Sequence, residues 1–153
     1  GLPVFYVDGQ SMGNEQRAIP RKARIAVVYQ WSSKPEESKV FWRDVGDKTN
    51  NEAEYLALLN ALSYISTNLA EKGSGTVPKR IGTITIFSDS ELMVKQMKGE
   101  YEVREPRLKE LKEEASMLME RMGSIELKNV RREMNYAGRW LEGLWKGGSV
   151  QKL

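Results

Sequence analysis

The sequence predicts an α/β fold in which one mixed, five-stranded sheet is flanked by helices, in the order βββαβααβα. Two features predict it. The first third of the chain contains three strand-like segments joined by polar turns, which is typical of an antiparallel meander. Beyond it the hydrophobic period becomes helical, and helices separate the later strands, which favours parallel pairing. The length of 153 residues, with 40% hydrophobic residues, fits a single domain over 1–153.

The meander begins with residues 2–8, which alternate like a half-buried strand and end at the turn-forming pair Asp8-Gly9. Further strands are expected over about 23–31 and 39–45, with a polar turn between them. These three segments therefore form the antiparallel part of the predicted sheet.

The later elements begin with a helix that Thr49 or Asn50 can cap and that ends near residue 71. Its apolar stripe consists of Leu58, Leu62 and Ile65. The following elements are expected to be a strand over 81–87, a helix over 90–98, a helix that begins near Pro106, a strand over 124–130 and a helix over 132–146. The tail, about 147–153, is expected to be mobile.

The composition excludes several kinds of catalysis. The chain has no Cys and no His, which rules out disulfides, thiolate zinc sites, cysteine nucleophiles and imidazole bases. Any hydrolysis must therefore depend on carboxylates, a Lys, a Tyr or metal ions held by oxygen. The net charge of +3 permits a polyanionic partner without demanding one. No apolar run approaches the roughly 20 residues that span a bilayer, and no signal segment opens the chain, so a cytoplasmic location without membrane association is expected.

Three acidic residues occupy positions where strands and a helix could bring them together. Asp8 and Asp89 end strands that we expect to be parallel neighbours, about 5 Å apart, and Glu54 lies in the first turn of the long helix. Carboxylates this close repel one another, and a hard divalent cation relieves the repulsion. Taken singly, each residue also fits a structural role, as a turn former, a helix cap or a partner of the helix dipole.

The strings around these acids resemble the three signature stretches of type 1 ribonuclease H. They are YVDG (6–9) followed by Gly13-Asn14, TNNEAEY (49–55) and FSDS (87–90), in the order and on the element types of that family. The resemblance implies a metal-dependent endonuclease that hydrolyses the RNA strand of an RNA–DNA hybrid and leaves 5′-phosphate and 3′-hydroxyl ends. It also implies two Mg²⁺ or Mn²⁺ ions held by Asp8, Glu54 and Asp89.

The same resemblance suggests which residues contact the hybrid. A nuclease specific for RNA must sense the 2′-hydroxyl, which suits neutral donor–acceptor groups. The matching positions, for which turn and cap roles remain open, are Gly9, Asn14, Asn50, Asn51 and Ser90. A monomer without an obligate protein partner is expected.

The fourth ligand of the family is where this sequence departs from the pattern. One alignment of residues 130–139 puts Arg139 at the position of the usual Asp, and a second, with a shortened loop, puts Asn135 there. We prefer the second, because an amide oxygen can ligate Mg²⁺ and a guanidinium cannot. The prediction is a D-E-D-N site of Asp8, Glu54, Asp89 and Asn135, with a helix-capping role for Asn135 as the alternative. Many members of that family carry a histidine before the last helix, which is thought to assist proton transfer or product release. This chain has no His, so that role is unfilled or falls to another group such as Glu133.

Other functions are also compatible with these residues. The site could belong to a catalytically weak or inactive hybrid-binding module, to a related nuclease with another substrate, or to a structural domain without a site. Two basic clusters could grip a hybrid or be solvated surface: Arg17, Arg21, Lys22 and Arg24, and Arg131, Arg132 and Arg139.

Overall fold

The computed structural model describes residues 2–12 and 20–153. Asn14 and Arg17, which the sequence singles out, lie outside these ranges. Among the described residues, no helix has the length and apolar character needed to span a bilayer.

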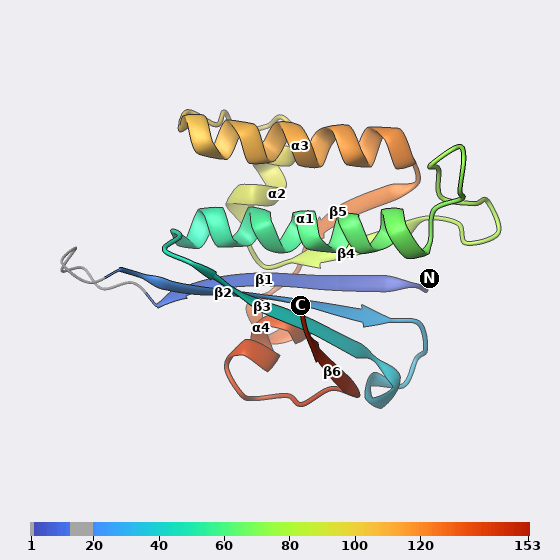
Figure 1. Cartoon of the computed structure of the whole chain (residues 1–153), viewed down its shortest axis with the longest axis horizontal. Helices are drawn as coiled ribbons and strands as arrows, with labels where there is room; N and C mark the ends of the chain where they lie inside the picture. Colours follow the sequence, from blue (N-terminus) through green and yellow to red (C-terminus); the bar gives the residue numbers. More distant parts are fainter. Residues whose placement is uncertain (1, 13–19) are drawn as a thin grey trace.

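A six-stranded sheet with the order β5-β4-β1-β2-β3-β6 forms the centre of the molecule (Figure 1). The β1–β2 and β2–β3 pairs are antiparallel, and the β1–β4, β4–β5 and β3–β6 pairs are parallel. The mixed α/β fold predicted from the sequence is therefore confirmed. The strands are β1 (Val4–Met12), β2 (Lys22–Gln30), β3 (Lys39–Gly46), β4 (Ile84–Ser88), β5 (Ile125–Asn129) and β6 (Ser149–Lys152).

Helices cover both faces of the sheet unequally (Figure 1). The larger layer contains α1 (Asn50–Asn68), α2 (Glu91–Met97) and α3 (Pro106–Met122), and the short α4 (Tyr136–Leu141) lies on the opposite face. Two 3₁₀ turns complete the order, η1 (Pro35–Glu37) and η2 (Arg132–Met134). This arrangement leaves the end of β1 beside the start of α1 on one side and beside α4 on the other.

The alternation of β1 divides its side chains between two cores. Phe5 and Val7 are fully buried in the main core under α1, whereas Tyr6 packs into the smaller core under α4. By the same alternation Asp8 lies on the α4 face, although it is also fully buried. The predicted apolar stripe of α1 is buried as expected.

Three of the predicted segments differ from the structure. β1 continues past Asp8 to Met12, because β2 still pairs with it after its pairing with β4 has ended at Val7. The helix expected over 132–146 is a 3₁₀ turn followed by one short helix, separated by the extended backbone of Asn135. The tail expected to be mobile forms β6, a sixth strand that pairs in parallel with β3.

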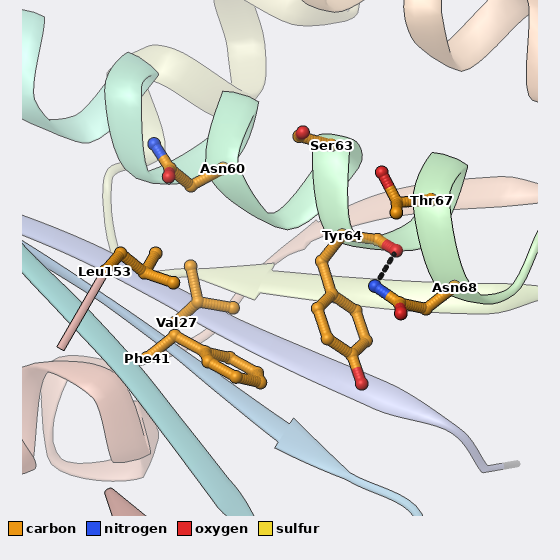
Figure 2. Close-up of a pocket in the computed structure, with 8 residues that line it drawn as sticks. All are labelled: Val27, Phe41, Asn60, Ser63, Tyr64, Thr67, Asn68 and Leu153. Atoms are coloured by element: carbon orange, nitrogen blue, oxygen red, sulfur yellow. Dashed lines mark hydrogen bonds between the residues drawn. The ribbon is translucent and has the colours of Figure 1, made fainter. Parts of the chain in front are cut away.

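A small cavity of about 190 Å³ lies between α1 and strands β2 and β3 (Figure 2). Val27 and Phe41 form its apolar wall, and the Asn68 side chain on its rim donates a hydrogen bond to the Tyr64 carbonyl at 3.1 Å. Leu153 lies at its edge. None of the predicted site residues lines this cavity, so it is separate from the acidic cluster.

Candidate active site

Three carboxylates, from β1, from α1 and from the bend after β4, converge at one end of the sheet. One oxygen each of Asp8, Glu54 and Asp89 lies within 4.8 Å of the others. The parallel register aligns Val7 of β1 with Ser88 of β4, so the residues that follow them, Asp8 and Asp89, lie side by side. The predicted convergence of the three acids is confirmed.

Glu54 reaches the cluster because α1 begins close to β1. Thr49 caps the helix, and its side chain and that of Glu52 form a reciprocal capping box with the backbone. This fixes the start of the helix, and just after its first turn Glu54 accepts a hydrogen bond from the Gly9 N–H at 2.8 Å.

Gly9 permits this close approach of strand and helix. A Cβ atom at this position would lie 2.2 Å from the carbonyl carbon of Ala53, well inside any real contact distance. The sequence predicts a substrate contact for Gly9, but in the structure its N–H is used by Glu54 and its lack of a side chain lets α1 pack on β1.

The cluster carries carboxyl groups whose pKa values are raised. Burial raises the pKa of Glu54 well above its ordinary value, and the neighbouring Asp8 charge raises it further. Burial likewise raises the pKa of Asp8 to about 6, although hydrogen bonding with the Glu54 side chain opposes this rise. Burial also raises the pKa of Asp89, although the Arg132 guanidinium opposes this rise. Without a cation, the three carboxyl groups therefore release their protons at a higher pH than ordinary surface carboxyl groups do.

The chemistry of the donors fits a hard divalent cation. Asp8 Oδ2 accepts from the Gln10 side chain at 3.1 Å, but the buried Oδ1 has no hydrogen-bond partner among the described residues. A buried carboxylate oxygen without a donor is costly unless a cation compensates it. Carboxylate oxygens are the ligands that Mg²⁺ and Mn²⁺ prefer.

Asn135 is brought to the site, but with its amide nitrogen toward the acids. Its Nδ2 donates to the Val7 carbonyl at 2.9 Å and to Asp89 Oδ2 at 3.2 Å. Its Oδ1 accepts from the Ala137 N–H at 3.1 Å and caps α4. Since a carbonyl can only accept, the amide nitrogen must face Val7. This geometry supports the capping alternative, and it does not support the predicted ligand role of Asn135.

The residue of α4 that faces the carboxylates is Gly138. A Cβ atom there would lie 3.2 Å from Asp8 Oδ2 and 3.4 Å from Asp89 Oδ2. Arg139, the other candidate for the fourth position, instead donates to the Glu133 carbonyl at 3.4 Å and does not enter the cluster. The helix therefore adds no fourth carboxylate to this site.

Arg132 lies beside the acidic cluster, a position that the sequence does not predict. Its Nη1 lies 3.4 Å from Asp89 Oδ2, and its Nε donates to Glu142 Oε1 at 2.7 Å. The 3₁₀ turn η2 makes this contact possible, because it turns the chain immediately before α4. No pattern in the sequence distinguishes Arg132 from its neighbour Arg131, so only the fold identifies it as a counter-charge.

The other predicted substrate residues lie around the cluster. Asn50 is exposed, and its Oδ1 accepts from the Ser11 N–H at 2.8 Å. Asn51 is exposed at the start of α1. Ser90 caps α2 by accepting from the Met93 N–H at 3.2 Å. Asn50 and Ser90 thus have structural partners, whereas Asn14 lies outside the described residues.

The strand order and the acidic cluster together define a ribonuclease H-like protein. The family described as reverse transcriptase-like matches residues 40–141, and the chain belongs to it. LC11-RNase H1, solved in complex with an RNA/DNA hybrid, is 31% identical, with 88% of this chain and 89% of that chain covered and a TM-score of 0.70.

Two further solved structures share the fold. The N-terminal RNase H domain of Rv2228c from Mycobacterium tuberculosis is 28% identical (TM-score 0.71), with 93% of this chain and 91% of that chain covered. RNase H1 from Halobacterium salinarum NRC-1 is 24% identical (TM-score 0.69), with 94% and 99% covered, and shows the shared fold. A search of curated proteins found no match. The resemblance to type 1 ribonuclease H is therefore confirmed at the level of the family.

Proposed function

We propose that this protein is a metal-dependent ribonuclease H that hydrolyses the RNA strand of RNA–DNA hybrids and leaves 5′-phosphate and 3′-hydroxyl ends. The observation that carries the proposal is the cluster of Asp8, Glu54 and Asp89 within 4.8 Å in a ribonuclease H fold. The hybrid bound to LC11-RNase H1 supports the substrate.

The three carboxylates would hold two Mg²⁺ or Mn²⁺ ions. When bound, these ions supply activation of the attacking water and charge neutralisation at the leaving oxygen. The protein's own part is to fix the carboxylates. The Gly9 N–H holds Glu54, and the Asn135 amide holds Asp89 and the β1 backbone. Preorganised acids of this kind need no histidine base, which suits the composition.

Recognition of RNA is assigned to neutral side chains around the cluster. Asn14, Asn50, Asn51 and Ser90 are proposed to contact the 2′-hydroxyls or the backbone of the hybrid. The exposure of Asn50 and Asn51 supports this, because their side chains are accessible at the start of α1. We also propose that residues 1–153 act as one domain and as a monomer in the cytoplasm.

The test is cleavage of a labelled hybrid with Mg²⁺ and then with Mn²⁺, with Asp8→Asn as the inactive control. The expected result is cutting of the RNA strand alone by the wild-type chain, with 5′-phosphate products. Duplex DNA and duplex RNA of the same sequence are expected to remain intact. Cutting of either duplex at the same rate would contradict the substrate assignment.

One observation favours a second candidate, a hybrid-binding module with a weak or inactive site. Gly138 occupies the position on α4 that faces the carboxylates, so three acids are present there and not four. This candidate predicts hybrid binding without cutting in either metal. The same assay, combined with a binding measurement, separates the two functions.

A further inference from the structure

A charged and aromatic surface lies on the α4 face of the sheet, beyond Asp8. The register places Asp8, Ala26, Trp42 and Lys152 in one row across β1, β2, β3 and β6. Neighbouring strands are about 4.8 Å apart, so the backbones of Trp42 and Lys152 lie about 10 Å and about 14 Å from that of Asp8. The row therefore runs from the acidic cluster beneath α4, where Ala26 is fully buried, and reaches the surface at Trp42 and Lys152 on the β6 side of the sheet.

Two cations flank the Trp42 ring from the neighbouring strands. The guanidinium carbon of Arg24 on β2 lies 4.2 Å from the ring centroid, and Lys152 Nζ on β6 lies 5.0 Å from it. Asp44 accepts from Arg24 Nε at 2.8 Å. The ring and this ion pair hold the guanidinium in one orientation, while its planar fork has further N–H donors to offer.

The charge of this surface is positive. The hydrogen bond from Arg24 lowers the pKa of Asp44, and the nearby charges of Lys152 and Lys22 lower it as well. Three cations thus surround one carboxylate on the exposed sheet. Such a group of cations favours a polyanionic ligand.

The β6 strand explains how Lys152 comes to this surface. All four residues of β6 are exposed, so the strand contributes almost nothing to the core. It pairs with β3 in a register that places Lys152 directly opposite Trp42. Strand β6 therefore changes the exposed surface next to β3 more than it changes the interior.

We propose that Arg24 and Lys152, held against Trp42, bind backbone phosphates of the hybrid where it extends from the acidic cluster past α4. This inference rests on the proposed function, because the ligand is the flanking part of the same hybrid. Phosphates are recognised by Arg through its planar fork and by Lys as a point charge. The surface thus positions the substrate and carries out no chemistry.

The experiment measures hybrid affinity over a series of salt concentrations in the Asp8→Asn chain with Mg²⁺, in which cleavage does not interfere. Lys152→Ala is expected to weaken binding about 3- to 10-fold near 0.1 M salt and to lower the slope of log affinity against log salt by about one. Lys152→Arg restores both values. Arg24→Gln, which removes the second charge, weakens binding in the same direction.

The matched control is Lys79→Ala. Lys79 is an exposed lysine in the connection between α1 and β4. In Figure 1 this connection lies at the end of the sheet opposite the start of α1. This variant is expected to leave affinity and salt slope unchanged. In the cleavage-competent chain, Lys152→Ala is expected to raise KM and to leave kcat unchanged.

The outcomes separate this inference from the proposed function. If the wild-type chain cuts hybrids while Lys152→Ala and Lys79→Ala bind equally well and with equal salt slopes, the phosphate contact is wrong and the nuclease assignment stands. If the chain neither binds nor cuts hybrids, both are wrong.

Discussion

Replacement of Asp8 by Asn is expected to stabilise the metal-free protein at neutral pH while it removes activity. Asp8 is fully buried, and its pKa is raised from 3.8 to about 6. Between these two values the folded state holds a proton that the unfolded state has released, so the stability falls as the pH rises. The full shift corresponds to about 3 kcal/mol above pH 6, at about 1.4 kcal/mol per pH unit.

The neutral amide introduced by Asp8→Asn avoids this cost and also removes the charge that raises the pKa of Glu54. For a protein of this size, about 3 kcal/mol corresponds to a rise in Tm of about 6–12 °C. The measurement is thermal unfolding followed by circular dichroism, in chelator, from about pH 4.5 to about pH 8.5. The wild-type Tm is expected to fall across this range, and the Asp8→Asn curve is expected to be flatter.

Two controls make the result specific. Asp44 is an exposed carboxylate whose pKa is lowered by its hydrogen bond with Arg24, so Asp44→Asn is not expected to stabilise the protein. Mn²⁺ at 100 times its Kd for the wild-type chain should stabilise that chain by about 2.7 kcal/mol. The stabilisation of Asp8→Asn by the same Mn²⁺ concentration should be smaller. A metal-free Asp8→Asn chain no more stable than wild type at about pH 7.5 would refute the reasoning.

Three other substitutions test the architecture of the site. Gly9→Ala is expected to lower stability by at least about 2 kcal/mol in chemical unfolding, because its Cβ would lie 2.2 Å from the Ala53 carbonyl carbon. Gly138→Asp adds a carboxylate beside Asp89, and it is expected to destabilise the metal-free protein by about 1–3 kcal/mol yet tighten Mn²⁺ binding in calorimetry. Asn135→Asp removes the amide donor and is expected to cost about 1–3 kcal/mol without tightening Mn²⁺ binding; tighter binding would instead indicate a ligand role.

The sequence predicts the acidic cluster well because its position depends on local rules. Asp8 directly follows the last residue of the shared β1–β4 register, and the capping box fixes the start of α1 just before Glu54. Each of these signals lies within a few residues of the acid that it positions. The family strings then place the three segments in one fold.

The region around α4 could not be predicted in the same way. Whether Asn135 offers its oxygen or its nitrogen to the acids depends on the Val7 carbonyl, which is 128 residues away in the sequence. The contact between Arg132 and Asp89 likewise requires the 3₁₀ turn. The β6 pairing depends on an exposed strand without a hydrophobic pattern, so periodicity gives no signal for it.

The composition of the α4 side of the site has a consequence for metal binding. The helix presents Gly138 where a fourth acid would fit, and the nearby Arg132 offsets part of the charge of Asp89. A cluster with three acids and an adjacent guanidinium attracts a second cation less strongly than four acids would. Because Mg²⁺ commonly completes its coordination with substrate phosphates, the hybrid itself is expected to supply the missing negative charge. Metal and hybrid should then strengthen each other's binding reciprocally, and the phosphate contacts proposed for Arg24 and Lys152 would hold the hybrid in place while the ions bind.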